Sequence, residues 1–125
     1  MNHILILSIL VNIVFSAVNF NIDLVQTIHV EAQNSNGNYG VSDVWGYTDE
    51  TGIEYAIVGY RYGTYIYDVS SDPQNPQLIS DIPGPSGNDM YYHRDYKTNG
   101  DILYIVNEMT GDDVGMQVID LSPLP

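Results

Sequence analysis

The chain of 125 residues contains no cysteine. A disulfide framework, a thiol nucleophile, a zinc–thiolate site and a lipid-modified cysteine are therefore all excluded. The stability of the protein has to come from packing within the chain or within a larger assembly.

Basic residues are scarce. Arg61, Arg94 and Lys97 stand against sixteen acidic residues, and the formal net charge is −13. A surface of this sign repels phosphate backbones and anionic lipid headgroups, so we expect neither a nucleic acid nor a membrane surface as a partner. The acidity indicates solubility in a salty extracellular medium, and cation binding is the alternative explanation.

Only one long apolar run is present, over residues 4–18, and it is interrupted by Ser8, Asn12 and Ser16. The run is shorter than the roughly 20 apolar residues that span a membrane. It ends in small residues, which is typical of a signal peptide, although His3 and the α-amino group are the only positive charges before it. We predict a signal peptide over residues 1–18 and a secreted or cell-surface protein. A retained anchor or a buried strand is the alternative.

Tyrosine is abundant, and all eleven tyrosines lie between Tyr39 and Tyr104. Tyrosines and β-branched residues at alternate positions favour strands, so we predict an all-β fold with almost no helix after residue 22. Residues 22–30 alternate apolar and polar side chains and are predicted to form a strand. Residues 33–38 have the composition of a loop.

The sequence after residue 39 contains an internal repeat with an offset of about 50 residues, which is within the range of propeller blades. Three segments recur in order: 42–45 at 94–97, 54–59 at 102–107, and 63–70 (GTYIYDVS) at 115–122 (GMQVIDLS).

One repeat is predicted to contain four antiparallel strands, and turn residues such as Asp49–Gly52, Asp72–Pro76 and Pro83–Gly87 separate them. The expected strands over the whole chain are 44–47, 54–60, 64–69, 77–82, 92–97, 102–107 and 115–121. We divide the chain into a signal (1–18), an N-terminal strand and loop (19–38), a first repeat (39–88) and a second repeat (89–125).

The second repeat contains only three of its four strands, and propellers typically have 4–8 blades. We therefore expect the chain to be a fragment of about two β-propeller-like blades. Its natural partners would include the remaining blades of its own full-length chain, and alone it would be poorly stable or self-associating.

The repeats resemble those of the LVIVD-repeat proteins, and more closely those of the exported choice-of-anchor B family. The resemblance spans about residues 22–122. It rests on these segments: 42–47 (SDVWGY), 54–59 (EYAIVG), 63–70, 72–73 (DP), 75–76 (NP), 83–85 (PGP), 105–106 (IV) and 116–121 (MQVIDL). It implies a secreted or surface-displayed β-propeller, and it supplies no catalytic residue.

We therefore expect an extracellular module for binding or scaffolding, with a protein or a glycan at the cell surface as its partner. The alternative is part of an exported hydrolase or lyase whose site lies in blades that are missing here. No catalytic residue and no cofactor-binding residue is assigned, and an enzyme is the less favoured interpretation.

Calcium is the one cofactor that the sequence makes conceivable, because it binds through oxygens of acidic loops. Two loops supply such residues: Asp49, Glu50 and Glu54 in the first, and Glu108, Asp112 and Asp113 in the second. Neither loop has the ligand spacing of an EF-hand. The histidines His29 and His93 lie too far apart in sequence to indicate a zinc or iron centre.

Several other motifs are interpreted as structural. His93-Arg94-Asp95 imitates a kinase catalytic loop without its other parts, and Ser86 lacks the strand–turn–helix context of a hydrolase nucleophile. Asp68 and Asp120 recur once per repeat, as expected for turn-forming residues. Trp45 and the tyrosines are expected to pack between blades, with a carbohydrate-stacking face as the alternative.

Overall fold

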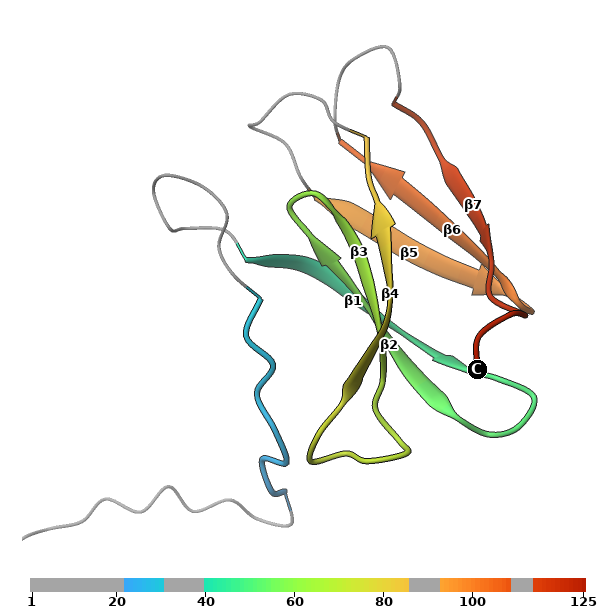
Figure 1. Ribbon diagram of the computed structural model, residues 1–125. Coiled ribbons are helices and arrows are strands. Elements are labelled where there is room, and N and C mark those ends of the chain that lie inside the picture. Colours follow the sequence, from blue (N-terminus) through green and yellow to red (C-terminus); the bar gives the residue numbers. More distant parts are fainter. Residues whose placement is uncertain (1–21, 31–39, 86–92, 109–113) are drawn as a thin grey trace, which may run out of the picture.

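The computed structural model describes residues 22–30, 40–85, 93–108 and 114–125, and this part of the chain contains seven strands and no helix. The strands form two antiparallel sheets (Figure 1). The four-stranded sheet, unit 1, has the order β1 (Val41–Thr48), β2 (Glu54–Tyr60), β3 (Gly63–Asp68) and β4 (Gln77–Pro83). The three-stranded sheet, unit 2, has the order β5 (Arg94–Asn99), β6 (Ile102–Asn107) and β7 (Gln117–Asp120).

The predicted all-β class and the seven strands after residue 40 are confirmed, four in the first repeat and three in the second. The bounds of β2 and β6 coincide with the prediction, and the other strands begin or end a few residues away from it. The predicted signal segment lies outside the described residues. In the described part of the chain, no helix is long and apolar enough to cross a membrane.

The strand predicted over residues 22–30 is wrong. This segment carries no strand structure, and the side chains of Ile22 and Leu24 are 74% and 78% exposed. A hydrogen bond of 2.9 Å joins Gln26 Nε2 to the carbonyl oxygen of Gln74. The alternating pattern gives each side chain a face, but a strand also needs a neighbouring backbone to pair with, which the pattern does not supply.

The connection between β1 and β2 shows how local chemistry sets the hairpins. Asp49 Oδ1 accepts hydrogen bonds from the backbone amides of Thr51 and Ile53 at 2.8 and 2.9 Å. Gly52 has a φ of 91°, which only glycine adopts at little cost. The β5–β6 turn likewise contains Gly100 with a φ of 56°. These turns place β1 beside β2 and β5 beside β6.

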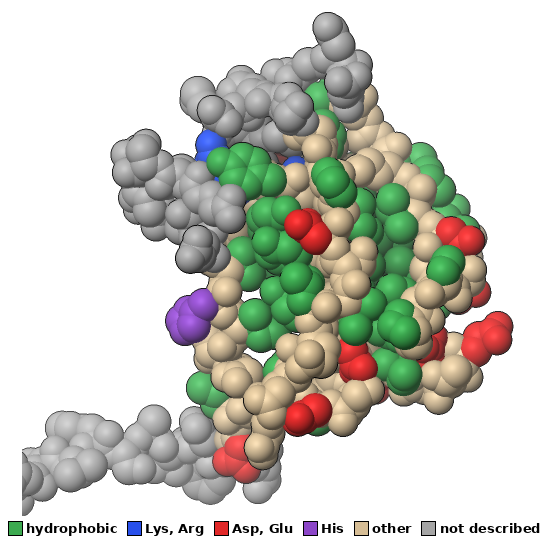
Figure 2. All heavy atoms as spheres, viewed as in Figure 1, with side chains coloured by type: hydrophobic (Ala, Val, Ile, Leu, Met, Phe, Trp, Pro, Cys, Tyr) green, Lys and Arg blue, Asp and Glu red, His purple; other side chains and the backbone are tan. Residues whose placement is uncertain are grey.

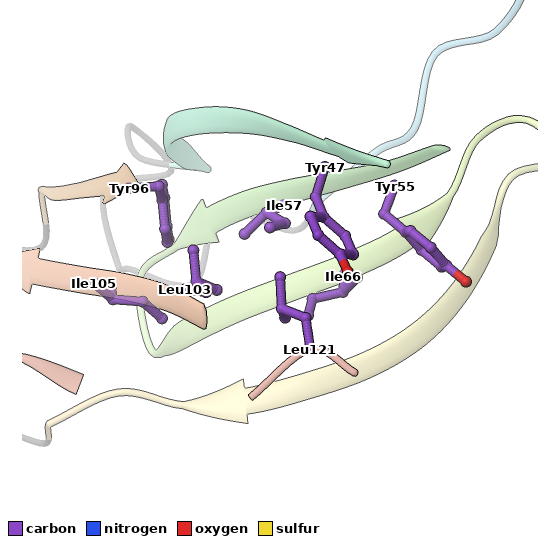
Figure 3. Packing of buried hydrophobic residues seen from close by; sticks show 8 residues of the cluster. All are labelled: Tyr47, Tyr55, Ile57, Ile66, Tyr96, Leu103, Ile105 and Leu121. Carbon is purple, nitrogen blue, oxygen red and sulfur yellow. The ribbon is translucent and has the colours of Figure 1, made fainter. Parts of the chain in front are cut away.

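The two sheets pack against each other through one hydrophobic core. Its buried members come from β1, β2 and β3 of unit 1, from β5 and β6 of unit 2, and from the residue after β7: Tyr47, Tyr55, Ile57, Ile66, Tyr96, Leu103, Ile105 and Leu121 (Figure 3). We call the side of each sheet that carries these residues its core face and the opposite side its outer face.

Polar contacts accompany this packing. The guanidinium of Arg94, which is buried, donates from Nη1 to the carbonyl oxygen of Tyr60 at 2.6 Å. The hydroxyl groups of Tyr96 and Thr64 share a hydrogen bond of 3.0 Å in the buried interface. Because Arg94 and Tyr96 belong to β5, this strand is attached to unit 1 by both polar and apolar contacts.

The repeat can be aligned by hydrogen bonds instead of by residue type. The backbone amide of Val69 donates to Glu54 O at 3.0 Å in unit 1, and Leu121 donates to Asp101 O at 2.8 Å in unit 2. Glu54 therefore corresponds to Asp101. The predicted match of residues 54–59 with 102–107 is one residue out, because the structural equivalent is 101–106. The matches 42–45 with 94–97 and 63–70 with 115–122 agree with the strand register.

This register decides which faces of the two units meet. Ile57 and Ile66 on the core face of unit 1 correspond to Tyr104 and Val118 of unit 2, and Val118 is 55% exposed on the outer face. Residues that are paired across a strand share a face, so opposite faces of the two equivalent sheets are in contact. The units therefore stack front to back and not face to face.

Candidate functional site

A hollow of about 450 Å³ runs along the first strands of both units. We call it the first-strand groove. It is lined by residues of β1, β5 and β6: Asp43, Val44, Trp45, Asp95, Tyr96, Lys97, Tyr104 and Val106. The groove exists because β1 and β5 lie next to each other where the two sheets stack.

Trp45, the single tryptophan of the chain, forms the junction of the two units in this groove. Its indole Nε1 donates to Thr98 Oγ1 of β5 at 3.0 Å. The Lys97 ammonium lies 4.0 Å from the centre of the Trp45 ring, within the range of a cation–π interaction. The prediction that Trp45 packs between the units is thus confirmed, and one face of its ring is occupied by the Lys97 ammonium.

The buried side of the groove is held by Tyr96. Only 2% of this residue is exposed, and its hydroxyl group meets Thr64 on β3. Burial raises the pKa of Tyr96, while the Thr64 hydrogen bond and the charge of Arg94 act in the opposite direction. The close approach needs glycine at position 59, because a Cβ atom there would lie 2.5 Å from the Tyr96 hydroxyl oxygen.

The remaining lining residues determine what the groove can do chemically. Asp43 and Asp95 are hydrogen-bond acceptors and negative charges, and Val44, Tyr104 and Val106 supply apolar walls. No serine, threonine or histidine lines the groove, so its described lining contains no pair of a hydroxyl nucleophile and a histidine base.

A second hollow of about 120 Å³ continues from the groove and shares Asp95 and Val106 with it. His93, Arg94, Asn107 and Glu108 complete its lining. The His93-Arg94-Asp95 triplet has a structural explanation here, because Arg94 points into unit 1 and binds backbone carbonyl groups. Ser86 lies outside the described residues.

An acidic hollow of about 210 Å³ lies at the turn end of the two units and brings together Asp49, Glu50 and Asp101. Tyr47 donates its hydroxyl group to Asp101 Oδ1 at 2.7 Å. This hydrogen bond, together with burial and the surrounding carboxylates, raises the pKa of Tyr47 to about 12. Acidic side chains gather at the lower end of the molecule in Figure 2, where the β1–β2 and β3–β4 turns lie.

The calcium candidates are not gathered into one site. Asp49 and Glu50 line the acidic hollow, Glu54 lies by a hollow on the outer face of unit 1, and Glu108 follows β6. Asp112 and Asp113 lie outside the described residues. Within 22–30, 40–85, 93–108 and 114–125, no group of three or more His, Asp or Glu side chains is arranged to hold a metal ion. Calcium binding stays a prediction.

The Asp49 carboxylate instead stabilises the turn between β1 and β2, where it accepts backbone hydrogen bonds. Burial raises its pKa, but hydrogen bonds from Thr51, Ile53 and Tyr55 outweigh this, and the pKa lies below its ordinary value. Asp68 and Asp120 do the same after β3 and β7: the amides of Ser70 and Ser122 donate to their Oδ1 atoms at 3.0 and 2.9 Å. The prediction that these repeated aspartates are turn-forming residues is confirmed.

Sequence reasoning missed Asp101 and Tyr104. Asp101 joins the carboxylates of the other hairpin only because the two units stack, and Tyr104 reaches the first-strand groove from β6. The turn glycine Gly100 marks where the chain reverses, but no sequence signal indicates which distant loop this turn meets.

Comparison of the chain with family models, with curated proteins and with solved structures found no match.

Proposed function

We propose that this chain is part of an exported, propeller-like repeat protein whose first-strand groove binds a partner at the cell surface. Front-to-back stacking of equivalent sheets supports the propeller-like interpretation, since it is the contact that adds one blade to the next. The apolar run at residues 4–18 supports export, and we expect cleavage between Phe15 and Phe20, after Ser16 or Ala17.

The observation that carries the binding proposal is the composition of the groove. It combines apolar walls with Asp43 and Asp95, and it lies on a chain with a net charge of −13. Carboxylates beside apolar surface complement a segment that carries Lys or Arg on an apolar stem. A basic, amphipathic segment of a partner protein therefore fits the groove better than a glycan, because Lys97 already occupies one face of the Trp45 ring.

The sole tryptophan makes this proposal testable, because Trp45 lines the groove and its fluorescence reports directly on occupancy. A short peptide that alternates Lys with Leu and contains no Trp or Tyr is titrated into the protein. We expect a saturable change in Trp45 emission that weakens as the salt concentration rises, since charge contributes to the binding.

The variant Asp43→Asn/Asp95→Asn should lose most of the response, whereas Asp23→Asn, which removes a charge from an exposed position away from the sheets, should retain it. A linear oligosaccharide serves as the second probe. A response to the sugar and not to the peptide would replace the protein partner with a glycan. No response to either probe would contradict a binding role for the groove.

A further inference from the structure

Both outer faces of the stacked pair carry apolar side chains. On unit 2, Met116 and Val118 are 57% and 55% exposed, and Val106 is 44% exposed. On unit 1, Val44 is 62% exposed beside a hollow of about 440 Å³ that Gly46 and Ala56 help to line.

The outer face of unit 2 repeats the chemistry of a face that is already buried. Its residues Ile102, Tyr104 and Val118 stand at the positions that Tyr55, Ile57 and Ile66 occupy on the core face of unit 1. Those three unit 1 residues belong to the hydrophobic core that unit 1 forms with unit 2. A second sheet could therefore dock on unit 2 in the same way.

The outer face of unit 1 has the complementary character. Val44, Ala56 and Val58 stand at the positions of Tyr96, Leu103 and Ile105, with which unit 2 packs on unit 1. At Gly46, which is paired with Ala56, a Cβ atom would meet no atom within 4 Å. This hollow provides room for the side chains of an approaching sheet.

We propose that two copies of this chain bind head to tail, with the outer face of unit 1 of one copy seated on the outer face of unit 2 of the other. The contact continues the interface that already joins the two units within one chain. The contact is heterologous, which means that two different surfaces meet. In a dimer, one copy still has its unit 2 outer face free and the other its unit 1 outer face, so association proceeds beyond the dimer. Because apolar side chains contribute to both faces and the chain is strongly acidic, screening by salt strengthens the association.

The test uses two lysine substitutions at exposed positions, Val44→Lys for the outer face of unit 1 and Val118→Lys for that of unit 2. Analytical ultracentrifugation measures the mass at increasing protein concentration, at about 0.1 M and about 1 M salt. The unsubstituted chain should form species larger than a dimer, and more of them at high salt. Each variant alone should remain a monomer.

Mixing the two variants is the decisive step. The Val44→Lys copy keeps a functional unit 2 face, and the Val118→Lys copy keeps a functional unit 1 face. Their mixture should form a dimer and nothing larger, because both remaining faces are blocked. Val25→Lys adds the same charge to the 22–30 segment, where Val25 is 59% exposed, and should associate as the unsubstituted chain does.

The other outcomes contradict the proposal in recognisable ways. If Val118→Lys abolishes association while Val44→Lys has no effect, the contact is a symmetric one between two unit 2 faces. If neither Val44→Lys nor Val118→Lys reduces the association, the contact is made by strand edges or by residues 4–18 and not by the outer faces. Circular dichroism verifies that each variant is folded, and Met116→Lys replaces Val118→Lys if the latter is not. A chain that stays monomeric throughout would also overturn the inference.

The head-to-tail contact includes Val44, Tyr104 and Val106, which also line the first-strand groove, so the peptide is titrated at a protein concentration where the chain is monomeric. A chain that does not respond to the basic peptide at that concentration but associates at higher concentration would contradict the binding proposal alone. A chain that responds to the peptide but remains monomeric would contradict the head-to-tail contact alone.

Discussion

Position 59 offers a sharp test of how closely the two sheets pack. A Cβ atom on Gly59 would lie 2.3 Å from Ser42 Oγ and 2.5 Å from the Tyr96 hydroxyl oxygen. Both distances are far below van der Waals contact, and Tyr96 is buried and hydrogen-bonded to Thr64. Gly59→Ala therefore forces the Ser42 hydroxyl and the buried Tyr96 ring to move, which costs about 1–3 kcal/mol of the free energy of unfolding.

Gly46→Ala is the matched control, because Gly46 also lies in a strand of unit 1 and its Cβ atom would meet nothing. Loss of backbone freedom in the unfolded chain should stabilise this variant by about 0.4–1 kcal/mol. The same gain is present in Gly59→Ala, so the two variants should differ by roughly 2 kcal/mol in total. For a domain of this size the difference corresponds to about 10 °C in melting temperature.

The assay is thermal unfolding followed by circular dichroism, at a concentration where the chain is monomeric. Ser42→Ala should restore part of the loss in the Gly59→Ala background, because it removes one of the two clashing atoms. The Ser42 hydroxyl is buried without a hydrogen-bond partner, so its removal alone should cost little. Equal melting temperatures for Gly59→Ala and Gly46→Ala would refute the close packing of β5 on β2.

Three further predictions concern charge and titration. Arg94→Met leaves the Tyr60 carbonyl group without its buried donor and should lower the free energy of unfolding by about 2 kcal/mol in urea titrations, whereas Arg61→Met should change it less. Hydrogen bonds from Ser71 and Ser122 lower the pKa values of Asp68 and Asp120. Their stabilisation is complete above the unfolded pKa of about 4 and is lost as the pH falls through the folded values, so Asp68→Asn/Asp120→Asn should flatten the acid limb of a plot of melting temperature against pH. The pKa of Tyr47 is raised to about 12 by its hydrogen bond to Asp101. That stabilisation is present below about pH 10 and lost as the pH rises toward 12, so Tyr47→Phe should lose stability at pH 8 and depend less on pH above 10.

Much of the fold follows from local patterns. Alternating Tyr, Ile and Val over β2 and β6 predicts both strands to the residue, and the Asp-x-Ser motif after β3 and β7 predicts two turns that form as expected. The segment 22–30 shows the limit of the same argument, since its alternation is equally clear but it has no strand to pair with.

The candidate site was much harder to foresee. Asp43, Trp45 and Lys97 could each be noted in the sequence, but their meeting depends on which faces of the two units stack. A shift of one residue in the alignment of β2 with β6 exchanges the two faces of a sheet. Residue types alone favoured the wrong register by that one residue, and only the equivalent backbone hydrogen bonds of Val69 and Leu121 correct it.

The most direct test of the central claim, that equivalent sheets stack front to back, is a nuclear Overhauser experiment on the isotope-labelled chain. We expect contacts from the Tyr96 ring to the Gly59 α-protons, and from the Leu103 and Ile105 methyl groups to Ile57 and Ile66, since these residues meet in the interface between the units. Contacts from Tyr104 and Val118 to Ile57 and Ile66, with Tyr96 and Ile105 exposed, would place the other face of unit 2 on unit 1 and contradict the account.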